Sequence, residues 1–86
     1  MEIFFMYDHK HPVRWAELSP EKKTEVTNKT SAILTATMQS PGKVVPYECL
    51  NKAGLEHLYH FLVDSWNDNH PGKIEVLEKG IRYTKA

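Results

Sequence analysis

Three side chains in the second half of the sequence have the residue types and spacing of a metal site. His57, His60 and Asp64 lie within seven positions of one another, so that on a helix they would share one face. Imidazole and carboxylate groups suit zinc or a similar divalent metal. The surrounding sequence is EHxxH rather than HExxH, and therefore does not resemble a zinc peptidase. A solvated helix face explains the same residues, and we expect no bound cofactor.

The same surface could instead contact another protein. Phe61 falls outside the apolar stripe of this segment and lies close to His57 on a helical wheel. Aromatic side chains are enriched at the centres of protein interfaces. We therefore predict an interaction patch of His57, His60, Phe61 and Asp64. Histidine changes charge near neutral pH, so binding through this patch should depend on pH.

A small excess of basic over acidic residues near the end of the chain suggests a nucleic-acid-binding protein as the alternative. A helix followed by a two-stranded basic hairpin resembles the C-terminal part of a winged-helix DNA-binding protein. The candidate contacts are Lys73, Lys79, Arg82 and Lys85. The whole chain, however, has eleven basic and eleven acidic residues, so the electrostatic signature of a DNA-binding protein is missing.

Catalysis finds little support in the sequence. Cys49 is the only cysteine, and its apolar-flanked position predicts a buried structural thiol rather than a nucleophile. The single cysteine also favours a reducing compartment. The sequence has neither a signal peptide nor a membrane span, so we expect a cytoplasmic protein with no membrane contact. Its small size suits an accessory protein of a phage or mobile element.

The element expected to position these side chains is a helix over residues 51–69. Its apolar residues recur at helical spacing and predict a face buried in the core. That stripe comprises Leu55, Leu58, Tyr59, Leu62 and Trp66, with Val63 at its edge.

A second helix is predicted over residues 20–38. Ser19 can cap it, and Pro20 suits the first helical position. Threonine is frequent in this segment and lowers helix propensity, so residues 31–39 could alternatively form a strand.

Short extended segments complete the predicted fold. The apolar run at residues 2–7 is typical of a buried strand, and Val44 and Val45 form a second short one. Residues 73–85 alternate and turn near Gly80, which predicts a hairpin. The order is β-α-(β)-α-β-β: a single α+β domain over residues 1–86, with two main helices on a short, mostly antiparallel sheet. A small core and zero net charge favour a non-enzymatic interaction module that binds a protein partner or itself as a homo-oligomer.

Overall fold

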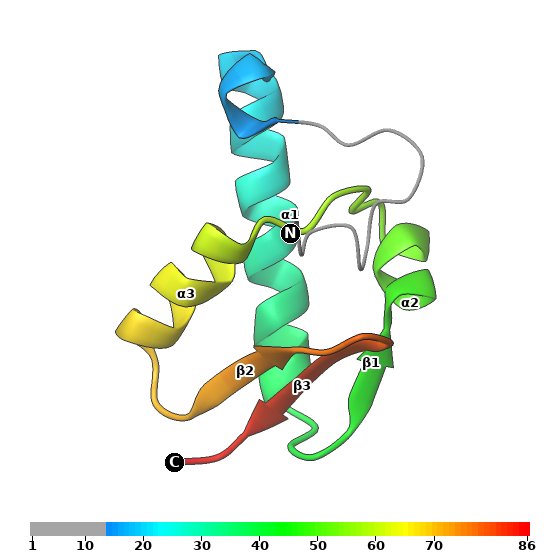
Figure 1. The fold of residues 1–86 in the computed structure, drawn as a ribbon, viewed down its shortest axis with the longest axis vertical. Helices are drawn as coiled ribbons and strands as arrows, with labels where there is room; N and C mark the ends of the chain where they lie inside the picture. Colours follow the sequence, from blue (N-terminus) through cyan, green and yellow to red (C-terminus); the bar gives the residue numbers. More distant parts are fainter. Residues whose placement is uncertain (1–13) are drawn as a thin grey trace.

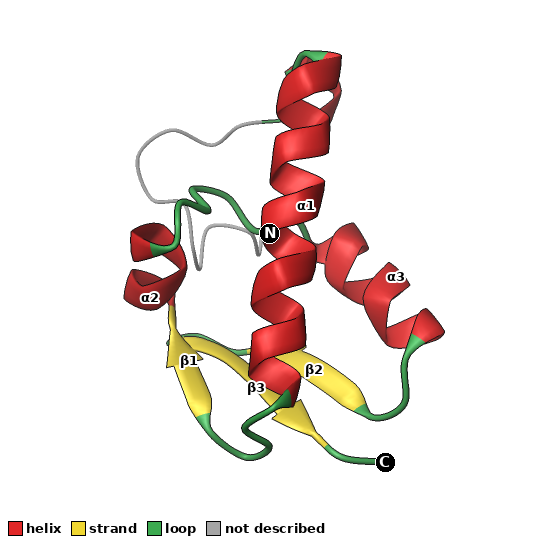
Figure 2. Ribbon diagram, turned by 180° about the vertical axis from the view of Figure 1, so that it is seen from behind, coloured by secondary structure: helices red, strands yellow, loops and turns green. Residues whose placement is uncertain are grey.

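The computed structural model describes residues 14–86 as a small α+β domain. The strand predicted at residues 2–7 lies outside the described residues. Helices α1, α2 and α3 surround one side of a three-stranded antiparallel sheet, with α1 as the long central element (Figures 1 and 2). This arrangement confirms the predicted fold class. None of the helices in residues 14–86 combines the length and apolar character needed to cross a membrane.

Helix α1 (Pro20–Met38) confirms the predicted helix and excludes the alternative strand at residues 31–39. The Ser19 side chain accepts a hydrogen bond from the Lys22 amide at 3.1 Å, and so satisfies one of the free amides at the helix start. Threonine is accommodated because its hydroxyl can bond the carbonyl one turn earlier. The Thr37 hydroxyl donates to the Ile33 carbonyl at 2.8 Å in this way.

The helix predicted over residues 51–69 is wrong as a continuous element. A short helix, α2 (Tyr47–Lys52), ends first, and Gly54 adopts a φ of 95°. The Leu55 amide donates to the Leu50 carbonyl at 2.9 Å, and the Gly54 amide donates to the Asn51 carbonyl at 3.0 Å. These two bonds form a Schellman motif, in which glycine supplies the left-handed residue that closes a helix. Residues 55–59 then run without regular structure into helix α3 (His60–Asn69).

The apolar stripe nevertheless marks the core correctly. Leu55 and Leu58 are 1% and 2% exposed although neither is helical, and Val63 of α3 is 2% exposed. Hydrophobic burial depends on where a side chain lies rather than on the backbone conformation that delivers it. The partly buried members of the stripe pack against the same core: Tyr59, Leu62 and Trp66.

Strands β1 (Val44–Pro46), β2 (Lys73–Val76) and β3 (Gly80–Thr84) form the sheet, in the order β1-β3-β2. Both pairings are antiparallel, and Ile81 of β3 lies opposite Val45 on one side and Val76 on the other. The predicted hairpin is therefore confirmed, as is the predicted short extended segment at Val44 and Val45.

Helix α1 contacts both α3 and strand β3, which places the core between the helices and the sheet (Figure 2). Leu34 of α1 and Ile81 of β3 are both fully buried at 0% exposure. Toward its C-terminal end, α1 meets α3 through the Trp66 indole, which donates to the Met38 sulfur at 3.3 Å. Helix α3 and the sheet are therefore held in place by packing against this core, and their outer surfaces face away from it.

Candidate functional site

Three aromatic rings gather where the chain enters α3. Trp15, in a 3-10 turn (Trp15–Glu17), meets the Tyr59 ring edge-on, with centroids 5.2 Å apart and an interplanar angle of 75°. Its ring meets Phe61 in the same way, at 5.0 Å and 83°. Edge-to-face packing is the favoured geometry for aromatic pairs. These three residues are called the aromatic cluster below.

Phe61 is the exposed member of the aromatic cluster. Its side chain is 45% exposed, and among the described residues Val44 is the only other large apolar side chain in the exposed class. The cluster forms because Tyr59 precedes the first turn of α3 and Phe61 lies within it, while the 3-10 turn brings Trp15 in from the other side. It is an apolar surface fixed by its own ring contacts.

The predicted interaction residues border two features of the structure. Phe61 belongs to the aromatic cluster, and the half-buried His57 has its ring centroid 6.4 Å from that of Tyr59. His60 and Asp64, one turn apart on α3, line a different hollow between α3 and β2. Because residues 55–59 are not helical, His57 does not share the helix face predicted for it, whereas His60, Phe61 and Asp64 all lie on α3.

Asn67 lines the hollow between α3 and β2 and connects the helix to the strand. Its side-chain amide donates to the Ile74 carbonyl at 3.0 Å, and its side-chain oxygen accepts from the Ile74 amide at 2.8 Å. This pair of bonds satisfies both backbone groups of Ile74 that face the helix. The contact fixes α3 against the sheet, and the hollow is bordered by charges of both signs, Asp64, Lys73 and Glu75.

The predicted nucleic-acid contacts are also dispersed. Lys79 lies in the turn of the hairpin, whereas Lys73 pairs with Thr84 at the opposite end, next to Lys85. At 3.3 Å per residue, the strand between the two ends spans roughly 10 Å. Arg82 donates to the Glu75 carboxylate at 2.7 Å, and this bond lowers the pKa of Glu75. These four residues therefore do not present one continuous basic surface.

The metal site predicted at His57, His60 and Asp64 required all three residues to lie on one helix. His60 and Asp64 lie on α3, but His57 lies in the irregular stretch before it. Within residues 14–86, no group of three or more His, Cys, Asp or Glu side chains is placed to hold a metal ion.

Cys49 is exposed, which corrects the prediction of a buried thiol. The buried positions of α2 are Tyr47 and Leu50, three residues apart, and Cys49 does not share their face of the helix. Burial in turn raises the pKa of the Tyr47 hydroxyl, which donates a hydrogen bond to the Leu77 carbonyl.

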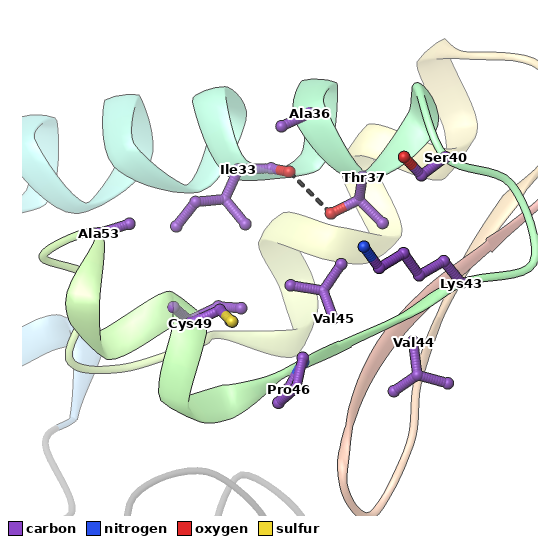
Figure 3. A pocket seen from close by; sticks show the side chains of 11 residues that line it. Ile33, Ala36, Thr37, Ser40, Lys43, Val44, Val45, Pro46, Cys49 and Ala53 are labelled. Atoms are coloured by element: carbon purple, nitrogen blue, oxygen red, sulfur yellow. Dashed lines mark hydrogen bonds between the residues drawn. The ribbon is translucent and has the colours of Figure 1, made fainter.

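A second hollow lies on the side of the molecule where α1, β1 and α2 meet (Figure 3). Its volume is about 280 Å³, and most of its lining is apolar. Lys43 and Cys49 also line it. No motif in the sequence indicated this hollow, because its walls come from three separate segments.

Comparisons with protein-family models, with curated proteins and with solved structures found no match. Sequence reasoning found Phe61 but assigned Tyr59 only to the core. The missed signal is the pairing of Tyr59 with Trp15, which are 44 positions apart and meet only in the folded chain.

Proposed function

We propose that this domain is a non-enzymatic protein-interaction module that self-associates through the aromatic cluster at the start of α3. The observation that carries the proposal is the exposed Phe61 ring, held by edge contacts to Trp15 and linked to Tyr59 at 6.1 Å. A protein with one exposed cysteine is suited to the reducing cytoplasm, which we propose as its compartment.

The energetics of aromatic contacts support this function. A Phe side chain offers a large apolar area and has only two rotatable bonds to immobilise. Its neighbours already restrict the Phe61 ring, so less entropy remains to be lost on binding. Interface hot spots are typically aromatic residues of this kind, surrounded by polar groups that exclude water.

The charge of α3 favours a protein partner over a phosphate backbone. The helix contains no Lys or Arg, and its exposed positions include Asp64 and Asp68. Carboxylates on this face would repel phosphate groups, and no side chain of α3 could make a bidentate contact with guanine. Zero net charge also removes long-range repulsion between copies of the chain.

A winged-helix nucleic-acid binder is the second candidate, and the topology supports it. Helices α2 and α3 are consecutive along the chain and are followed by the β2–β3 hairpin, and β1 joins that hairpin in the order β1-β3-β2 (Figure 1). In this arrangement α3 would be the recognition helix and the hairpin the wing, with Lys79 at its tip.

Sedimentation equilibrium over a wide concentration range tests self-association. We expect the average mass of the wild type to rise with concentration, and Phe61→Ala to weaken association by about tenfold or more, as hot-spot truncations do. Val44→Ala is the matched control, since Val44 is an exposed apolar residue outside the aromatic cluster. A wild type that stays monomeric at millimolar concentration would disprove self-association.

Fluorescence anisotropy with a labelled DNA duplex at low salt separates the two candidates. The interaction proposal predicts no binding at protein concentrations up to about 100 μM, the weak end of typical non-specific DNA binding. The winged-helix candidate predicts salt-sensitive binding that weakens in Lys79→Ala and is unchanged in Lys23→Ala on α1.

A further inference from the structure

The hollow between α1, β1 and α2 has the composition of a small-molecule site. Ile33 and Ala36 line it from α1, Val45 from β1, and Ala53 from the end of α2 (Figure 3). Its volume of about 280 Å³ approaches the lower end of ligand pockets, roughly 300 Å³. A cavity of about 150 Å³ already accommodates benzene. One short alkyl chain or one aromatic ring would fit.

One cation is positioned over this apolar lining. Among the described residues that line the hollow, Lys43 is the only charged one, and its side chain extends along it, with the ammonium group toward Val45 and Thr37 (Figure 3). None of the ion pairs among the described residues includes Lys43. The Thr37 hydroxyl is already engaged, since it donates to the Ile33 carbonyl at 2.8 Å. The ammonium group is thus the charged group available to a ligand.

The backbone that carries Lys43 is fixed on both sides. The Lys43 amide donates to the Ser40 carbonyl at 3.2 Å, and the neighbouring Gly42 amide donates to the Tyr83 carbonyl at 2.8 Å. On the other side, Val44 pairs with Arg82 in the sheet. The hollow is therefore built on ordered elements, which lowers the entropic cost of binding.

We propose that this hollow binds a small monocarboxylate with an apolar body, such as a medium-chain fatty acid. The alkyl chain would lie against Ile33, Ala36 and Val45, and the carboxylate would pair with the Lys43 ammonium. Charge complementarity selects this class of ligand, because within residues 14–86 the lining contains one cation and no acidic residue. The site lies on α1, β1 and α2 and does not depend on the aromatic cluster of α3.

Titration of the full chain with octanoate, octanol and octylammonium, followed by amide NMR, tests the proposal. The three probes share one apolar body and differ only in their head groups. We expect octanoate to shift the resonances of residues around the hollow, in segments 33–37, 43–46 and 49–53. Octanol should bind about fivefold more weakly, the upper end for a solvent-exposed ion pair, and octylammonium more weakly still.

Two variants separate the roles of charge and shape. Lys43→Gln should make octanoate and octanol bind equally, whereas Lys23→Gln, on α1 and not among the residues that line the hollow, should leave the preference unchanged. Ala36→Leu keeps an exposed helical position helical, fills the hollow and should abolish binding of all three probes. Cys49 supplies an independent readout, because bound octanoate should slow its alkylation by neutral iodoacetamide.

Several outcomes would overturn the proposal. These are equal binding of octanoate and octylammonium, an octanoate preference that survives in Lys43→Gln, and shifts confined to the aromatic cluster. Resonances of the hollow that move with protein concentration alone would show that a second copy occupies it, and would also contradict the proposal.

Discussion

Helix α1 and the segment at residues 51–69 differ in how their sequence signals relate to their structures. The weaker helix signal belongs to the continuous helix, and the stronger one belongs to the segment that is interrupted. The segment at 51–69 has a clean apolar stripe, yet it splits into the end of α2, an irregular stretch and α3. The threonine-rich α1 is one continuous helix of 19 residues. The contrast shows that apolar periodicity predicts which side chains are buried, whereas local backbone chemistry decides where a helix begins and ends.

The two segments differ most at their boundaries. Ser19 and Pro20 give α1 a defined start, and no glycine interrupts it. In the second segment Gly54 closes α2, and the bond from Lys29 to its carbonyl, 3.2 Å long, ties this turn to α1. The stripe of residues 51–69 is therefore divided by a C-terminal cap that lies within it.

The largest expected effect comes from removing a buried leucine from either segment. Leu34→Ala in α1 and Leu55→Ala in the irregular stretch should each lower the free energy of unfolding by about 3–5 kcal/mol, because both leave a cavity at a buried position. Urea denaturation measures both. A cost below about 1 kcal/mol for Leu55→Ala would show that the irregular stretch does not belong to the core.

Gly54→Ala tests whether the glycine cap is what interrupts the helix at residues 51–69, because the sign of the stability change depends on it. Because Gly54 has a φ of 95°, alanine should destabilise the domain by about 1–2 kcal/mol. Gly42→Ala, at a φ of 83° with open space around a new Cβ, is the control for backbone strain alone. If Gly54→Ala stabilises the protein and raises its helix content, residues 51–69 favour a continuous helix after all.

Ser19→Ala tests the start of α1. Loss of the side-chain bond to the Lys22 amide should cost about 1 kcal/mol. Ser40→Ala, just beyond the other end of the helix, should change stability by less. Thermal unfolding followed by circular dichroism compares the two, and equal effects would contradict a capping role for Ser19.

The smallest expected effect is on the stability of the domain at acid pH. It concerns Glu25, whose partner Lys29 connects α1 to the turn at Gly54. The hydrogen bond from Lys29, supported by the charges of Lys22 and Lys29, lowers the pKa of Glu25. A lowered pKa in the folded state gives stability that is present above the ordinary glutamate pKa, about 4.3, and is lost as the pH falls through the folded value.

Glu25→Gln should therefore flatten the loss of stability on acidification, whereas Glu78→Gln in the hairpin turn should not. The effect is small because the Glu25 carboxylate is exposed to solvent. Urea denaturation between about pH 3 and pH 6 measures it, and identical pH profiles for wild type and Glu25→Gln would contradict the assigned cause.

The sequence by itself determined the fold class, the start of α1, the terminal hairpin and the core-facing residues of the segment at 51–69. These features depend on neighbouring residues or on a short repeat, such as the Ser19 cap and the alternation of residues 73–85. Gly54 was readable as a C-terminal cap, but the apolar stripe that continued past it favoured one helix. The glycine cap and the apolar stripe are both local signals, and in the folded chain the cap ends the helix at this point.

Only the tertiary structure decided how the surface is divided. It placed His57 outside the helix that carries His60 and Asp64, dispersed the basic residues of the hairpin, and joined Trp15 to Tyr59 across 44 positions. It also formed the Lys43 hollow from α1, β1 and α2. Surface sites such as these arise from contacts between distant segments, and a periodic pattern within one segment carries no information about which other segment will lie beside it.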